Sequence, residues 1–128
     1  MRTVDEAGML DACTFISFDE DNLLTARQTN PAAHLGYFHI QPGPIDPAEV
    51  VDRIGASLLV VWPKAAEPEV VAAARAAGLR VRCGFADDMT YEESYAVFRR
   101  MAAMGVGEIS CGRPDWIGRM IADVAAAQ

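Results

Sequence analysis

Residues Val70 to Asp115 read VVAAARAAGLRVRCGFADDMTYEESYAVFRRMAAMGVGEISCGRPD. Two alanine-rich, helix-forming stretches alternate there with two shorter and more apolar runs, and Gly78 and Gly105 separate each helix from the strand that follows it. Glycine at such a position permits the left-handed turn that ends many helices. The segment therefore predicts two successive helix–strand units, a pattern typical of a parallel α/β protein.

The same alternation extends towards the amino terminus. Short runs that are apolar throughout, or rich in β-branched and aromatic residues, predict strands. We expect five of them, at Cys13–Phe18, His34–His39, Leu58–Trp62, Arg80–Phe85 and Glu108–Cys111. We expect helices near Thr3–Met9 and Glu20–Gln28, after Asp46, from Pro68 to Gly78, from Thr90 to Met104 and from Pro114 onward.

Several helix boundaries are marked by residues that satisfy unpaired backbone amides or stop the helix. Asp46 stands before a proline, with an acid three residues after it, which predicts a helix start. Thr90-x-x-Glu93 is a capping box, in which each side chain accepts a hydrogen bond from the other residue's amide. Asn30 precedes Pro31, so the second helix is expected to end there.

Length and charge restrict the class of protein. The 128 residues suffice for one compact domain, 1–128, whereas an eight-stranded βα barrel needs about 250 residues. Acidic residues outnumber basic ones by 18 to 11, which makes the formal net charge -7. This balance argues against nucleic acids and anionic membranes as partners.

The cysteines and the distribution of apolar residues point to a cellular compartment. Cys13, Cys83 and Cys111 show no metal-binding spacing, and we interpret them as small buried apolar side chains. No signal peptide opens the chain, and no apolar run approaches the ~20 residues of a membrane span. These features predict a cytoplasmic protein without a membrane span.

Three segments resemble the glycerophosphodiester phosphodiesterase family. Residues Ala76–Val81, AAGLRV, and Gly105–Asp115, GVGEISCGRPD, resemble the endings of its last two strand units, roughly AAGLKVHVWTVND and GVDGIITDRPD. Residues Phe15–Asp19, FISFD, resemble the family's ISSFDPEVL segment, which belongs to its fourth strand. The resemblance runs from Asp11 to Ile117 and implies the second half of a TIM barrel.

The resemblance also implies an activity. Members hydrolyse a glycerophosphodiester to an alcohol and glycerol 3-phosphate, using Ca²⁺ or Mg²⁺ and acid–base histidines. The family's His-Arg-Gly opening, its Glu-x-Asp pair, its second catalytic histidine and its Glu-x-Lys have no counterpart here, and His34 and His39 stand in unrelated contexts. We therefore expect no catalytic residue, metal site or cofactor in this chain, although a full-length relative would need Ca²⁺ or Mg²⁺.

Five parallel strands fit two architectures. The resemblance favours a partial TIM barrel, curved and open. Five strands in about 130 residues are also typical of a flavodoxin-like, doubly wound open sheet. A partial barrel leaves two strand edges exposed, which favours a homo-oligomer or association with the missing barrel half.

In either architecture a functional site would lie at the carboxyl ends of the strands. Candidate pocket residues at these ends are Ser17, His39, Lys64, Phe85, Asp87 and Arg113. Lys64 and Arg113 could receive the phosphate of a small molecule, since Arg113 stands where a helix begins. Alternatively, Arg113 pairs only with Asp115.

The other candidates also have two interpretations. Ser17, His39 and Asp87 are the residue types of a hydrolase triad, but no Gly-x-Ser-x-Gly motif surrounds Ser17. His39 is either an acid–base group or a satisfied histidine at a strand end. The pair Asp87–Asp88 is either a cation site or a solvated turn.

The family's seventh strand usually ends in Trp-Thr-Val-Asn, where this chain has Gly84-Phe85-Ala86-Asp87. The aromatic wall of the pocket is thus either lost or moved one place, to Phe85. Three functions remain open: a fragment or shortened form of the phosphodiesterase barrel, a non-catalytic module that binds a phosphorylated ligand or a partner subunit, and a small enzyme on a flavodoxin-like sheet.

Overall fold

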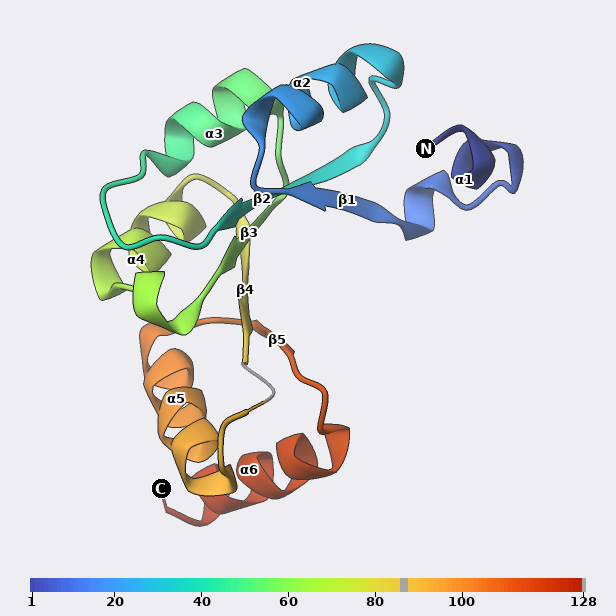
Figure 1. Ribbon diagram of the computed structural model, residues 1–128. Helices are drawn as coiled ribbons and strands as arrows, with labels where there is room; N and C mark the ends of the chain where they lie inside the picture. The colour runs from blue at the N-terminus through green and yellow to red at the C-terminus, as the bar shows by residue number, and fades with distance from the viewer. Residues whose placement is uncertain (86–87, 128) are drawn as a thin grey trace.

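The computed structural model describes residues 1–85 and 88–127, in which strands and helices alternate (Figure 1). The elements are α1 (Arg2–Glu6), the 3₁₀ helix η1 (Leu10–Ala12), β1 (Thr14–Ser17), α2 (Glu20–Thr29), β2 (His34–His39), α3 (Pro47–Ile54), β3 (Leu58–Val61), the 3₁₀ helix η2 (Pro63–Ala65), α4 (Pro68–Ala76), β4 (Arg80–Gly84), α5 (Tyr91–Met104), β5 (Glu108–Ser110) and α6 (Pro114–Ala126). The predicted alternation of five strands with helices is confirmed.

The strand order distinguishes the two expected architectures. All neighbouring strands pair in parallel, and their order in the sheet, β1-β2-β3-β4-β5, is their order along the chain. A flavodoxin-like sheet has the order 2-1-3-4-5 instead, so that alternative is wrong. Sequential parallel strands joined by helices are the arrangement of a βα barrel, of which this sheet is a part. Within the described residues, β1 and β5 are its two edges.

One face of the sheet carries the hydrophobic core, and helices α2 to α6 lie on that side (Figure 1). Side chains alternate between the two faces along a strand. The helix-covered face receives the buried strand residues Leu35, Leu59, Val61, Val81 and Cys83. Helices α2 to α4 pack onto these with Leu23, Val50, Ile54, Val71 and Ala74. At ~25 cal/mol per Å² of apolar surface, this burial is the main source of stability.

The opposite face of the sheet, called the open face below, is not covered by these helices (Figure 1). Its side chains come from all five strands and include Ile16, Phe38, Val60, Arg82 and Ser110. In a complete βα barrel the corresponding face lines the barrel interior and is packed with side chains. Here Ile16 is 39% exposed.

The helix boundaries follow the predicted caps. The Asp46 carboxylate accepts hydrogen bonds from the amides of Ala48 and Glu49 and begins α3. At the start of α5, the Thr90 hydroxyl accepts from the Glu93 amide at 3.2 Å, and the Glu93 carboxylate accepts from the Thr90 amide at 2.8 Å. Gly105 ends α5 in the left-handed conformation, at φ 86°. These three predictions are confirmed.

Two details differ from expectation. The helix expected at Thr3–Met9 ends at Glu6, because Gly8 adopts a positive φ of 70° and turns the chain before η1 begins. The segment after β3 forms the short helix η2, which begins at Pro63 and was not predicted. The strands otherwise match within one residue at each end. None of the helices in residues 1–85 and 88–127 is both long and apolar enough to cross a membrane.

Candidate functional site: a pocket on the open face

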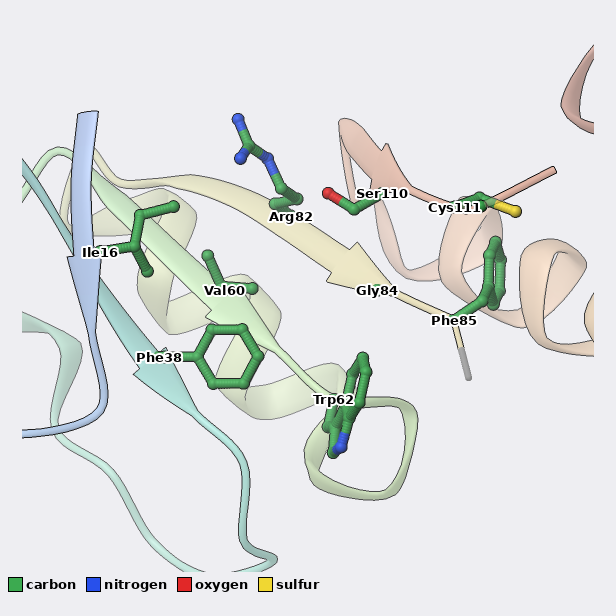
Figure 2. Close-up of a pocket in the computed structure, with 10 residues that line it drawn as sticks. Ile16, Phe38, Val60, Trp62, Arg82, Gly84, Phe85, Ser110 and Cys111 are labelled. Atoms are coloured by element: carbon green, nitrogen blue, oxygen red, sulfur yellow. The ribbon is translucent and has the colours of Figure 1, made fainter. Parts of the chain in front are cut away.

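A pocket of about 430 Å³ lies on the open face of the sheet, and we call it the sheet pocket (Figure 2). Its wall comes from all five strands and from the residues that follow β3, β4 and β5: Ile16, Phe38, Val60, Trp62, Arg82, Gly84, Phe85, Ser110, Cys111 and Gly112. An adjoining, more apolar hollow is lined by Ile16, Ser17, Phe18, Phe38, Ile40 and Trp62. Together they form a continuous surface that shares Ile16, Phe38 and Trp62.

Trp62 forms the aromatic wall of the sheet pocket. Its ring meets Phe38 edge to face, with the ring centroids 5.9 Å apart. It also lies directly over Gly84, where an added Cβ would come within 2.6 Å of Trp62 Cζ3. Trp62 can occupy this place only because Gly84 has no side chain.

A cluster of three charged side chains lies on the same face of the sheet, across the pocket from Trp62 (Figure 2). Arg80 and Arg82 occupy alternate positions of β4 and share a single carboxylate, that of Glu108 in β5. Arg82 Nη2 lies 2.9 Å from Glu108 Oε1, and Arg80 Nη1 lies 3.2 Å from Glu108 Oε2. Two guanidinium groups against one carboxylate leave the cluster with one surplus positive charge. Of the three side chains, that of Arg82 lines the sheet pocket.

Apart from Asp87, which the structure does not describe, the predicted site residues follow or end strands at the carboxyl edge of the sheet without forming a single constellation. Ser17 ends β1, and its hydroxyl accepts a hydrogen bond from the Asp19 amide at 3.0 Å. His39 ends β2, but the alternation of side chains directs it to the helix-covered face, away from the sheet pocket. Its Nε2 is buried without a hydrogen-bond partner among the described residues. Ser17 pairs with Tyr37, which is two residues before His39, so the side chains of Ser17 and His39 are directed to the same, helix-covered face, although Ser17 also borders the apolar hollow.

The two residues expected to bind a phosphate, Lys64 and Arg113, lie in different surroundings. Lys64 lies in η2 and is exposed. Arg113 lies at the start of α6, makes two hydrogen bonds to the Asp115 carboxylate at 3.1 and 2.7 Å, and stacks over Trp116 at 4.2 Å. The bond from Arg113 lowers the pKa of Asp115. Arg113 is thus held by Asp115, the second of the two interpretations considered above.

Phe85 is buried and lines the sheet pocket, whereas Asp87 lies outside the described residues. The expectation that all three cysteines are buried is wrong for two of them. Cys13 and Cys111 are half-buried, because they flank β1 and β5 rather than lying within them. Cys83 is buried on the helix-covered face, and this burial raises the pKa of its thiol to about 11.

Solved structures with the same fold include a candidate glycerophosphoryl diester phosphodiesterase from Silicibacter pomeroyi, with a TM-score of 0.80 and 25% sequence identity over 95% of this chain. A glycerophosphodiester phosphodiesterase from Parabacteroides distasonis matches with a TM-score of 0.77 and 20% identity over 97%. A phosphodiesterase from Oleispira antarctica, solved with the product sn-glycerol 3-phosphate, matches with a TM-score of 0.69 and 19% identity over 84%. The chain has the fold of part of a glycerophosphodiester phosphodiesterase barrel.

The match covers 42%, 49% and 41% of those three structures, so this chain spans less than half the length of each. The resemblance to this family, and the partial TIM barrel it implies, are therefore confirmed. No protein-family model matches the sequence, and no curated protein matches it.

The phosphodiesterase family implies a divalent metal, and the donor groups that the structure describes do not fit one. Across residues 1–85 and 88–127, no group of three or more histidine, cysteine, aspartate or glutamate side chains is arranged so that it could hold a metal ion. The ion-paired Glu108 faces two arginines, which disfavour a cation there. We therefore derive no metal-dependent step from these residues.

The structure decides the question of the aromatic wall. The sequence resemblance aligns Gly84 with a tryptophan of the family's seventh strand, and here the ring of Trp62, which follows the neighbouring strand, covers Gly84. The wall is therefore neither lost nor supplied by Phe85 alone. Trp62 follows Leu58 and Val60 at the two-residue spacing of a strand face, a signal that could have placed it on the open face. Arg80 and Arg82 show the same spacing, but their link to Glu108 depends on strand register.

Proposed function

We propose that this chain is a glycerophosphodiester phosphodiesterase-like protein that supplies the wall of a ligand pocket and has no catalytic residues of its own, as a fragment or a shortened form of the barrel. The open face supports this proposal most. A pocket of about 430 Å³ lies on the side of the sheet that a barrel encloses, and the described residues around it offer no set of metal ligands.

The substrate class follows by analogy. The Oleispira antarctica phosphodiesterase was solved with sn-glycerol 3-phosphate, so a glycerophosphodiester is the proposed substrate of the complete barrel, with a role in lipid and glycerol metabolism in the cytoplasm. The remaining strands would come from the missing barrel half or from a second copy. Ca²⁺ or Mg²⁺ would be bound by residues outside those described here.

A second function is a non-catalytic α/β module that binds a phosphorylated ligand or a partner subunit. The surplus positive charge of Arg80 and Arg82 over Glu108 favours it, because an anion can bind there without any catalytic group. The reading frame upstream separates the two proposals. A coding sequence for His-Arg-Gly and Glu-x-Asp there supports the barrel half, and its absence favours the module.

An assay of the purified chain tests the lack of activity. We expect no hydrolysis of bis(p-nitrophenyl) phosphate above the protein-free rate, with Ca²⁺, with Mg²⁺ or with a chelator, because the described residues offer no metal-binding constellation. A complete phosphodiesterase of the family, assayed in parallel, is the positive control. Chelator-sensitive turnover that stays with the protein through a further purification step would overturn the proposal.

A further inference from the structure

The charged cluster on the open face is positive although the protein as a whole carries a net charge of -7. Arg80 and Arg82 lie on one strand, two residues apart, so both side chains leave the same face of the sheet. Glu108 can satisfy only part of their ten N–H donors. The side chain of Arg82 is 29% exposed and lines the sheet pocket, so its remaining donors are accessible from the pocket.

An apolar surface stands next to this cation. Phe38 of β2 and Val60 of β3 are register partners, Val60 pairs in turn with Arg82, and Trp62 directly follows β3 on the same face (Figure 2). The pocket volume of about 430 Å³ falls within the range of about 300–1,000 Å³ that is typical of small-molecule sites. An arginine beside an aromatic wall suits a ligand with an anionic end and an apolar body.

We propose that the sheet pocket binds a phosphate ester with an apolar substituent, its phosphate held by Arg82 and its apolar group lying against Trp62. The inference rests on the proposed role of the open face as a ligand wall and names the chemistry of the ligand. A guanidinium presents two parallel donors to two phosphate oxygens, a geometry that a lysine ammonium cannot match. Arg80, which binds the other carboxylate oxygen of Glu108, adds positive charge without lining the pocket.

The ligand's phosphate and the Glu108 carboxylate compete for the same guanidinium group of Arg82. This competition determines whether each of two substitutions raises or lowers the affinity for the ligand. Arg82→Gln removes the anion's partner and weakens binding. Glu108→Gln removes the competing carboxylate, keeps the side chain's shape and tightens binding. A purely structural role for the ion pair predicts that both variants lose ligand equally, because breaking either side disturbs the same contact.

Tryptophan fluorescence reports on the pocket directly, because Trp62 lies in its wall and Trp116, the second tryptophan, lies outside it. In a Trp116→Phe background, phenyl phosphate should change Trp62 emission saturably. Phenol has only the apolar ring and inorganic phosphate has only the anion, so each should bind at least about tenfold more weakly than phenyl phosphate. Arg82→Gln should weaken phenyl phosphate binding by about tenfold or more, and Glu108→Gln should tighten it severalfold.

Two further variants serve as controls for the role of the Arg82 guanidinium. Arg82→Lys keeps the charge but loses the paired donors, and should bind with intermediate affinity. Arg53→Gln is the matched control, because Arg53 is also an ion-paired arginine, bound by Glu20 and Glu49, but lies on the helix-covered side. It should bind as tightly as the parent. Thermal unfolding of every variant confirms that the fold is retained.

Several outcomes would overturn the inference. One is that Trp62 emission shows no saturable response up to roughly 10 mM phenyl phosphate. Another is that the Arg82→Gln variant binds phenyl phosphate as tightly as the parent, and a third is that the Glu108→Gln variant binds it more weakly than the parent. Trp62 emission that changes with protein concentration but not with ligand would mean that a second copy fills the pocket itself, which also refutes the inference. Such failures leave the proposed lack of activity untouched, since the hydrolysis assay is independent of them.

Discussion

The backbone at Gly84 lies directly beneath the ring of Trp62, so a single added methyl group at this residue would disturb the pocket wall. Alanine there places a methyl group within 2.6 Å of Trp62 Cζ3. We expect Gly84→Ala to lower the free energy of unfolding by about 1–3 kcal/mol, the usual cost of overpacking, and to shift Trp62 emission. Urea unfolding and fluorescence measure both effects. Gly107→Ala is the control, since nothing lies within 4 Å of its Cβ position. Equal stability of the two variants would contradict the packing described.

The thiol of Cys83 gives a prediction for alkaline pH. Burial raises its pKa from 9.0 to about 11, so the folded chain keeps the thiol protonated where the unfolded chain ionises it. Its contribution to stability is complete below pH 9.0 and is lost as the pH rises towards about 11. Over this window the advantage of the parent over Cys83→Ala should shrink by roughly 2–3 kcal/mol. Urea unfolding of both proteins at the two ends of the window checks this, and a constant difference would refute it.

Among the elements, α5 depends on the pair of cap hydrogen bonds at its start. Thr90→Ala removes the hydroxyl that accepts from the Glu93 amide, and we expect it to lower the free energy of unfolding by about 1 kcal/mol. Thr3→Ala, at an exposed position within α1, should change it by less than about 0.5 kcal/mol. Chemical unfolding of the two variants side by side measures the difference. An equal loss from both would mean that the cap does not hold α5.

The elements were predictable because their signals are local. Thr90 and Glu93 stand three residues apart, and Gly105 ends the same helix without help from distant residues. The strand pattern alone left the order of the strands open, since a βα unit has the same pattern in a barrel and in a flavodoxin-like sheet, and only the family resemblance favoured the barrel. The Arg82–Glu108 ion pair and the contact of Trp62 with Gly84 could not be predicted from the sequence either. Each contact joins neighbouring strands, and only the folded sheet defines their register.

For the whole molecule, the two edges of the sheet determine its behaviour in solution. Strands β1 and β5 leave ladder groups unpaired within the described residues, and apolar Phe18 and Ile121 near these edges are 69% and 57% exposed. A few hundred Å² of such surface costs several kcal/mol at ~25 cal/mol per Å², comparable to the stability of a whole domain. We therefore expect self-association through the strand edges. Light scattering at low micromolar concentration should show particles larger than a monomer.

Charged substitutions locate the association. Phe18→Lys and Ile121→Lys should each shift the scattering towards the monomer, because a charge near an edge opposes pairing. Ala72→Lys adds the same charge to an exposed position of α4, away from both edges, and should leave the association unchanged. A monodisperse, well-folded monomer of the parent chain would show that the edges need no partner.

The sequential strand order also has a consequence for how the chain acquires its structure during synthesis. Each strand pairs only with its neighbours in the chain, at offsets that run from 20 residues (Thr14 with His34) to 26 residues (Arg82 with Glu108). Each pairing therefore closes a loop of a single βα unit, and no strand has to wait for a distant part of the chain. As the polypeptide leaves the ribosome, every new βα unit finds its pairing partner already exposed, so the sheet can grow one strand at a time from the amino terminus.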